Sequence, residues 1–358
     1  MATFPSKVNY ATGDILTATN MNDVGGAINL LDGAQGSAGK NTVINGGMDI
    51  WQRGTSIVGT TTSFSADRWQ SYRGVAGSTF SRQVTGDTTN LPNIQYCVRV
   101  QRDSGNTATT GIFFAQNFET VNSIPLAGKT VTLSFYARAG ANYSRASNGL
   151  TVSLTTGTGT DQNGLTGAYT GSVTAISQTA TLTTSWQRFT YSATLASNIS
   201  EINTTFTFVP VGTAGAADYY EITGVQLEAA NTASNFQRAA GNIQGELAAC
   251  QRYYYLSASG TNKPIANGNN NSATLMRAVI PFPVTMRTTP TVVASSGTDY
   301  YLYQCAAAND TFNSITLGDV STNAISVFNN TEISGTAGQG GLILTNNASA
   351  SVAFSAEI

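Results

Sequence analysis

Residues 128–139 read GKTVTLSFYARA, and their pattern is that of a β-strand with one buried face. Apolar residues occupy every second position in this segment, namely Val131, Leu133, Phe135 and Ala137. A period of two residues is typical of a strand whose one side packs against a core. The segment therefore predicts β-structure and gives the positions that face inward.

The same alternation returns along the chain. It is clear in residues 189–195 and 222–228, and residues 205–209 form a further candidate strand. Clusters rich in glycine, threonine and asparagine, such as residues 155–167, separate these strands as turns do. Several short strands of this kind predict a jelly-roll β-sandwich over residues 41–240.

The composition predicts an all-β protein throughout. Only 10% of the 358 residues are charged, 36 are glycine, and threonine is more frequent still. Threonine and aromatic residues favour strands, whereas glycine and asparagine favour the turns between them. The length suggests about two domains.

Several classes of function are excluded or disfavoured by composition. The chain has no histidine, which excludes Ser-His-Asp and Cys-His catalytic arrangements and every histidine-ligated metal site. A net charge of −2 gives no basic surface for nucleic acid, and no apolar run is long enough to insert in a membrane as a helix. We expect the three cysteines to be buried free thiols in a protein made in the cytoplasm.

Two short helices are predicted besides the strands. In residues 17–31, TATNMNDVGGAINLL, apolar residues recur every three or four positions, at Met21, Val24, Ile28 and Leu31. A helix this short and interrupted by two glycines is marginal in water, so we expect it to pack against its own domain or against other copies of the chain. Residues 32–40 follow as a flexible linker.

The second helix is predicted over residues 242–254, and the polar residues 257–272 are interpreted as a loop. The apolar stripe of this helix consists of Ile243, Leu247, Cys250 and Tyr254. Later strands are predicted at residues 280–284, 291–294, 315–317, 325–328, 342–344 and 352–354. The predicted organisation is an N-terminal segment (1–40), the jelly roll (41–240), a linker helix (241–256) and a smaller C-terminal β-domain (257–358).

The core of the jelly roll is expected to rest on tryptophans. These are Trp51, Trp69 and Trp186. Large aromatic side chains bury about 150–250 Å² each and can anchor a core that is poor in leucine and isoleucine. Arg53 and Arg68 stand beside Asp49 and Asp67 in the sequence, which predicts structural ion pairs at the core edge.

Ordered motifs along the chain resemble those of a known family. Residues 45–55 read NGGMDIWQRGT and residues 64–69 read FSADRW. Further motifs are GKTVTLSFYARA (128–139), SWQRFT (185–190), ITGVQLEAANTASNFQR (222–238), GELAACQRYYY (245–255) and FPVTMRTTPTV (282–292). Together they resemble bacteriophage and prophage tail-fibre-like structural proteins.

The resemblance implies a carbohydrate-binding-module-like jelly roll, a homotrimer, and a place on the virion tail after assembly in the host cytoplasm. Residues 10–23, YATGDILTATNMND, are similar to the leader that attaches such proteins to the particle. The attachment residues expected from it are Tyr10, Asp14, Leu16, Met21, Val24, Ile28 and Leu31. The implied partners are other copies of the chain, other tail proteins and a host-surface glycan, with neither nucleic acid nor membrane insertion.

Three functions stay open at this point. The first is a non-enzymatic tail fibre or receptor-binding protein, and the second is a capsid decoration or head fibre protein. The third is a tailspike-like glycan hydrolase, which would need two paired carboxylates. The C-terminal domain offers five acidic residues for this, Asp299, Asp310, Asp319, Glu332 and Glu357.

A glycan site is predicted where aromatic residues gather in the C-terminal domain. Its residues are Asp299, Tyr300, Tyr301 and Tyr303, because tyrosine rings can stack on sugar rings. Alternating tyrosines on a strand more often form a half-buried sheet face than a ligand site. No catalytic residue, metal ligand or cofactor is predicted, while a structural calcium ion on aspartate and backbone oxygens stays open.

Overall fold

The computed structural model describes residues 39–59, 62–91, 93–306 and 309–358. The predicted helix at 17–31 and all seven predicted attachment residues lie outside this part of the chain. Strands account for 44% of the structure and helices for 6%, so the all-β prediction is confirmed. Within the described ranges, none of the helices has the length and apolar character to cross a membrane. The predicted homotrimer remains a prediction.

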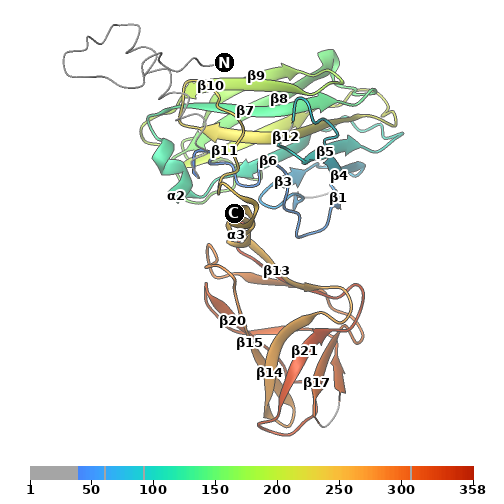
Figure 1. The fold of residues 1–358 in the computed structure, drawn as a ribbon. Helices are drawn as coiled ribbons and strands as arrows, with labels where there is room; N and C mark the ends of the chain where they lie inside the picture. Colours follow the sequence, from blue (N-terminus) through green and yellow to red (C-terminus); the bar gives the residue numbers. More distant parts are fainter. Residues whose placement is uncertain (1–38, 60–61, 92, 307–308) are drawn as a thin grey trace, which may run out of the picture.

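The upper body in Figure 1 is a sandwich of two six-stranded sheets, and the pairs within both are antiparallel. The first sheet has the order β1-β4-β5-β12-β7-β10 and the second the order β2-β3-β6-β11-β8-β9. Their bounds are β1 Ser56–Val58, β2 Ser63–Phe64, β3 Gln70–Tyr72, β4 Ser78–Val84, β5 Tyr96–Arg102, β6 Ile112–Asn117, β7 Thr130–Ala139, β8 Gly149–Gly157, β9 Val173–Thr181, β10 Gln187–Thr194, β11 Glu201–Phe208 and β12 Tyr219–Glu228. Between β6 and β8 lie the short helices α2 (Thr120–Ser123), η1 (Ile124–Leu126) and η2 (Ala146–Asn148).

The core between the two sheets is built from the positions that the alternation predicted. The four apolar residues of β7 are fully buried in it. Trp69 stacks on Phe114 with ring centroids 4.5 Å apart and also contacts Phe206. All three tryptophans are buried; Trp51 and Trp69 belong to this core, and Trp186 lies in a separate cluster on the other face of the first sheet.

Strand β12 is buried on both faces, although its sequence alternates. The polar side chains of Glu221, Thr223, Gln226 and Glu228 have no exposed surface. Glu221 forms ion pairs with Arg99 (2.6 Å) and Arg138 (2.6 Å), so its buried charge is compensated. The outward face of this strand is therefore polar and yet closed to solvent.

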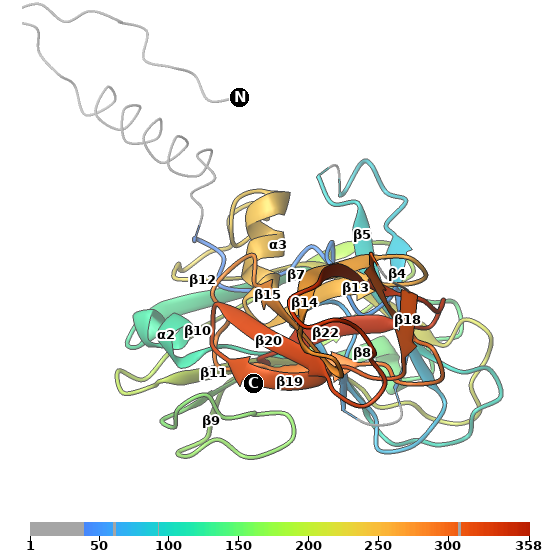
Figure 2. The ribbon, with the colours of Figure 1, turned by 90° about the horizontal axis from the view of Figure 1, so that it is seen from below.

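The lower body in Figure 1, here called the C-terminal unit, contains two further antiparallel sheets. One has the order β13-β22-β16, and the other, curved into a half-barrel, has the order β18-β17-β21-β14-β15-β20-β19. Their bounds are β13 Tyr254–Ser259, β14 Pro264–Ser272, β15 Leu275–Pro281, β16 Thr291–Ala294, β17 Tyr301–Cys305, β18 Asn309–Phe312, β19 Thr316–Val320, β20 Ala324–Asn329, β21 Gly340–Thr345 and β22 Ser351–Ser355. Figure 2, seen from below, shows this unit in front of the sandwich.

The interpretation of residues 257–272 as a loop is wrong. Strand β13 continues to Ser259, and Pro264–Ser272 form β14 in the middle of the half-barrel sheet. The sequence of β14, PIANGNNNS, has few apolar residues and so no readable alternation. Its place comes from backbone pairing with β15 on one side and β21 on the other.

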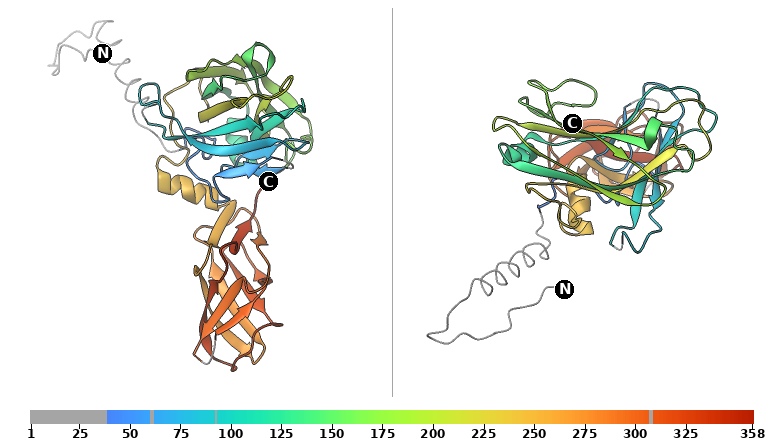
Figure 3. Two further views of the ribbon diagram at one scale, coloured as in Figure 1. Left: turned by 90° about the vertical axis from the view of Figure 1, so that its right-hand side faces the viewer. Right: turned by 90° about the horizontal axis from the view of Figure 1, so that it is seen from above.

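Helix α3 (Ile243–Gln251) lies between the two bodies, as Figure 3 shows from the side. The Asn242 side chain caps it by accepting a hydrogen bond from the Gly245 amide (2.9 Å). The predicted helix exists, but its buried residues are Glu246 and Cys250, whereas Ile243 is 48% exposed. The Glu246 carboxylate turns inward because it accepts hydrogen bonds from the backbone amides of Asn45 and Ala240.

Replacing Glu246 by glutamine is expected to change how stability depends on pH. Burial raises the pKa of the Glu246 carboxyl, so the folded protein holds this proton more tightly than the unfolded chain. This group therefore adds stability below its unfolded pKa of about 4.3, and the contribution is lost as pH rises through the folded pKa. Glutamine does not titrate. As pH rises, the free energy of unfolding of Glu246→Gln should therefore increase relative to that of the wild type.

Urea unfolding of both proteins at several pH values measures this difference. Asp319→Asn, at an exposed carboxyl on β19, is the control and should follow the wild type. Parallel pH courses for Glu246→Gln and the wild type would contradict the role given to Glu246.

Candidate functional site

The tyrosines predicted to contact glycan lie in the core of the C-terminal unit. Tyr301 and Tyr303 have no exposed surface. The Tyr301 hydroxyl donates to the Ser295 carbonyl (2.6 Å), and its ring stacks on Phe312. This part of the prediction is wrong, because alternate residues of β17 face the inside of the half-barrel and both tyrosines are on that side.

The two remaining residues of this predicted site lie in the loop before β17. Asp299 is exposed and Tyr300 is half-buried, with its backbone amide bonded to the Gly297 carbonyl (3.3 Å). Neither residue lines any of the three grooves described below. Glycan contact through Asp299 and Tyr300 therefore remains a prediction without a formed cavity around it.

A groove on the sandwich is a better formed candidate. It consists of two hollows of about 360 and 380 Å³ that share the lining residues Leu91, Asn93 and Ile94. We call this region the loop groove; its lining residues are 84–91, 93–95, Tyr136 and 235–238. Volumes of this size are within the range of about 300–1,000 Å³ typical of small-ligand sites.

The floor of the loop groove is apolar and preformed. Leu91, Ile94 and Trp186 are buried in one cluster, and the half-buried rings of Tyr136 and Phe236 pack against it. The indole of Trp186 donates to the Thr85 carbonyl (3.2 Å), which fixes the loop that forms one wall. The packing of this floor therefore sets the shape of the groove before any ligand arrives.

A glycine allows this close packing. Gly224, in the bulge of β12, has φ +60°, and a Cβ there would lie 2.8 Å from Ile94 and 2.9 Å from Tyr136. Glycine tolerates this left-handed conformation without steric cost. The bulge thus allows Ile94, in the loop before β5, to lie close to the ring of Tyr136.

The rim of the loop groove carries amides that are free to bind. The side chains of Asn93, Asn235 and Gln237 make no hydrogen bond to the described residues, and Asn93 and Asn235 are exposed. Each amide offers donors and an acceptor. Together with the aromatic floor, the groove can stack against the apolar face of a ring and hydrogen-bond its polar substituents.

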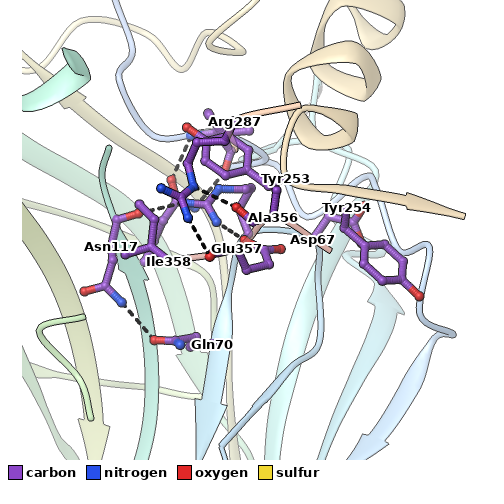
Figure 4. Close-up of polar contacts among 12 residues, drawn as sticks. Asp67, Gln70, Asn117, Tyr253, Tyr254, Arg287, Ala356, Glu357 and Ile358 are labelled. Atoms are coloured by element: carbon purple, nitrogen blue, oxygen red, sulfur yellow. Dashed lines mark hydrogen bonds and ion pairs between the residues drawn. The ribbon is translucent and has the colours of Figure 1, made fainter. Parts of the chain in front are cut away.

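Apart from the loop groove, a cluster of polar contacts, shown in Figure 4, joins the sandwich to the C-terminal unit. We call it the junction socket; its residues are Arg53, Arg68, Asp161, Asn163, Arg287 and the segment 356–358. The carboxylate of Glu357 is bound by Arg68 and by Arg53 (3.1 Å). These pairs are almost fully buried, with Arg68 2% and Glu357 6% exposed.

Main-chain contacts complete the junction socket. Arg287 donates to the carbonyls of Ala356 (2.7 Å) and Glu357 (2.8 Å) and pairs with Asp161 of the sandwich (2.9 Å). Asn163 donates to the Ile358 carbonyl (3.0 Å). Segment 356–358 is therefore held by both bodies, and we expect them to move as one.

Two arginines of the socket also stack on the tyrosines that follow α3. Arg53 lies 3.5 Å from the Tyr254 ring centroid and 4.8 Å from that of Phe64, and Arg68 lies 3.6 Å from the centroid of Tyr253. Such cation–π contacts contribute up to about 2 kcal/mol when desolvated. Tyr253 and Tyr254 thus join the two bodies, whereas Tyr255 packs on Phe282 and Phe354 within the C-terminal unit.

The structure explains the motifs at residues 45–55 and 64–69. All four charged residues form ion pairs, as predicted, but mostly with more distant partners: Arg53 lies 3.9 Å from Asp67, whereas Arg68 binds Glu357 and Asp49 binds Arg238. Glu357 is almost 300 residues away in sequence, and no local pattern indicates it. Among the groove residues, Tyr136 and 235–238 fall within motifs of the family resemblance, which is the one signal that pointed to them.

The acidic residues do not form a catalytic pair in any of these grooves. The first hollow of the loop groove contains no carboxylate and the second contains Asp87. A third groove of about 420 Å³, between α2 and α3, contains Glu119, which is bound by Arg252 (2.6 Å) and Tyr253 (2.8 Å). Across the described residues, no three potential metal-ligating side chains gather into a group.

No protein-family model and no curated protein matches this chain. Among solved structures it is similar to one described as "CBM4 structure and function", with 20% identity over 51% of this chain and 97% of that one, and a TM-score of 0.32. It is also similar to the enzymatically active domain of tailspike protein 4 of bacteriophage CBA120, with 11% identity over 54% of this chain and 22% of that one (TM-score 0.33). A third is TmCBM61 in complex with beta-1,4-galactotriose, with 13% identity over 45% and 88% (TM-score 0.28). Likenesses this distant do not determine function.

Proposed function

We propose that this protein is a non-catalytic, glycan-binding protein of a bacteriophage tail. The sequence motifs that resemble tail-fibre-like proteins support the placement on the virion, with the N-terminal segment attached to other tail proteins and the chain as a homotrimer. The rigid junction socket supports a structural role, because it fixes two β-sheet bodies end to end. The ligand of this protein would be a glycan of the host surface.

The observation that carries glycan binding is the composition of the loop groove. Its rings of Tyr136 and Phe236 offer an apolar face, and its unbound amides surround that face. Sugar rings present the matching surface, apolar on their faces and rich in hydroxyls at their edges. The hydroxyls of such a ligand can pair with these amides, so that polar groups covered on binding find partners.

Replacing Tyr136 by alanine is expected to weaken glycan binding by about tenfold or more. A tenfold change in affinity corresponds to about 1.4 kcal/mol of binding free energy. Loss of a ring that stacks on the sugar is expected to cost about this much or more. A glycan microarray on the full chain identifies bound sugars, and calorimetry on one of them measures the change. Tyr219→Ala is the matched control, because Arg99 lies over the Tyr219 ring as Arg188 lies over that of Tyr136, but Tyr219 does not line the groove. Equal affinities for both variants would remove the groove from the proposal.

The hydrolase alternative is disfavoured because it needs two carboxyl groups about 5–9 Å apart across a glycosidic bond. Neither hollow of the loop groove contains more than one. Incubation of the protein with any glycan it binds should release no new reducing ends. Labelled protein seen on the capsid shell of intact particles, instead of the tail, would favour the decoration alternative.

A further inference from the structure

We infer that the first hollow of the loop groove binds an acidic sugar, whose carboxylate pairs with Arg188. The first hollow is the one lined by Tyr136, Asn235 and Phe236. This inference rests on the proposed glycan-binding function and adds the ligand class. It is carried by three features: the position of Arg188 beside this hollow, the lack of an anionic partner for its guanidinium, and the absence of a carboxylate from the lining of the hollow.

Arg188 lies at the border of the first hollow and is half-buried, so part of its side chain stays open to solvent. On β10 it is paired with Tyr136 of β7, and its guanidinium lies over the Tyr136 ring, 5.6 Å from the centroid. Its Nη2 donates to the Ser234 carbonyl, next to a lining residue of the hollow. On the other side of β7, Gly224 of β12 allows Ile94 to approach the same ring. In the order of the strands, Tyr136 therefore stands between the apolar floor and a cation.

The guanidinium of Arg188 has no anionic partner among the described residues. Its Nη2 donates only to neutral oxygens, the Ser234 carbonyl and the Ser134 hydroxyl (3.3 Å), and its Nε is buried without an acceptor. Two other arginines near the groove differ in this respect, because Arg138 pairs with Glu221 and Arg238 with Asp49. An arginine fork can bind a carboxylate through two parallel hydrogen bonds. Arg188 therefore retains a charge and donors for a ligand.

The lining of the first hollow contains no carboxylate that would repel an acidic ligand. Near Arg188, the buried carboxylate of Glu228 accepts a hydrogen bond from the Ser234 amide (2.7 Å), and Lys40 at 3.5 Å compensates its charge. The second hollow contains Asp87 as well as Arg238. We therefore place the acidic ring in the first hollow.

A uronic or sialic acid matches this arrangement. Its ring offers an apolar face to Tyr136, and its hydroxyls match the amides of Asn93 and Asn235 on the rim. Its carboxylate can then pair with Arg188. A neutral sugar would leave this guanidinium without an anion, so the carboxylate adds affinity that a hydroxymethyl group at the same position does not supply.

The first test compares acidic and neutral sugars of the same shape on the full chain. A glycan array carries disaccharides that contain glucuronic, galacturonic or sialic acid, each beside its carboxyl-reduced form. We expect at least one acidic disaccharide to bind about tenfold more tightly than its reduced form, and the difference to shrink as salt is raised. Equal binding of both forms, or binding of neutral glycans alone, would overturn the acidic ligand class and leave the proposed function in place. Absence of binding to every glycan would overturn the proposed function itself.

Arg188→Gln tests whether this arginine is the cation. Glutamine can still donate to the Ser234 carbonyl, so we expect an unchanged urea unfolding midpoint. The acidic disaccharide should lose about tenfold in affinity, whereas its reduced form should change little. Arg188→Lys keeps the charge without the fork and should retain part of the preference for the acidic form.

Arg82→Gln is the matched control for this series. Arg82 also lies over a tyrosine ring, that of Tyr96 (4.6 Å), but Tyr96 lines neither hollow. We expect the control to bind the acidic and the reduced disaccharide as the wild type does. An undiminished preference for the acidic form in Arg188→Gln would contradict the role given to Arg188.

Discussion

Replacing Arg68 by alanine is expected to lower the free energy of unfolding by about 3 to 5 kcal/mol, because it leaves a buried carboxylate without its main partner. Arg68 binds Glu357, donates to the Asn117 carbonyl (2.8 Å) and lies over Tyr253. The contacts with Glu357 and Tyr253 link the sandwich to the C-terminal unit and to the segment that leads into it, whereas the contact with Asn117, at the end of β6, holds Arg68 in place within the sandwich. We expect the variant to lose both stability and the fixed arrangement of the two bodies.

Denaturant unfolding measures the loss of stability, and small-angle scattering together with limited proteolysis near residues 251–260 measures the loss of fixed arrangement. Arg277→Ala is the matched control, since Arg277 is exposed on β15 and has only a distant contact with Phe328 (5.9 Å). The double variant Arg68→Met, Glu357→Gln should recover part of the stability, because it removes both charges together. If Arg68→Ala and Arg277→Ala unfold and scatter alike, the junction socket does not join the two bodies.

Replacing Trp69 by alanine is expected to destabilise the sandwich by about 3 to 5 kcal/mol. Trp69 is fully buried, stacks on Phe114 and donates from its indole to the Asn45 carbonyl (3.1 Å). Its removal leaves a cavity at the centre of the core, and the Asn45 carbonyl keeps the Met48 amide (3.1 Å) as its remaining donor. The effect should appear as an earlier denaturation midpoint of the sandwich.

Trp69→Phe provides the comparison, because it keeps an aromatic ring and loses the indole hydrogen bond. We expect it to cost about 1 to 3 kcal/mol less than alanine at this position. Trp186→Ala should act differently, since Trp186 underlies the loop groove outside the central core. Its main expected effect is weaker glycan binding. A loss of unfolding free energy as large as that of Trp69→Ala would contradict the assignment of Trp186 to the groove and not to the central core.

The fold class could be predicted from local pattern alone. The alternation in residues 131–137 names the side chains that face the core, and β16 has the predicted bounds, Thr291–Ala294. Strand β14 could not be predicted in this way, because backbone pairing places it and its side chains have no alternation. Helix α3 was predicted, but its buried face depends on amides from residues 45 and 240 that the helix sequence does not contain.

The candidate site was harder to predict than the fold. Tyrosine content pointed to Tyr301 and Tyr303, and the pleat of β17 turned both rings into the core. The loop groove joins Tyr136 to residues 84–91, 93–95 and 235–238, and none of these segments has a distinctive sequence of its own. Their common site arises from strand order, since β5, β12 and β7 are neighbours in one sheet.

The residue types and their spacing determined the fold class and the available side-chain chemistry: strands in place of helices, few charges, no imidazole, and a core that contains tryptophan. The tertiary structure alone decided which charges meet. Arg68 and Glu357, 289 positions apart, become partners because the chain returns after β22 to the base of the sandwich, where Figure 1 marks the C-terminus. Local periodicity indicates burial, because the preference of a side chain for the core depends on that side chain alone. Ion pairs and grooves depend on contacts between distant segments, and only the complete fold brings these segments together.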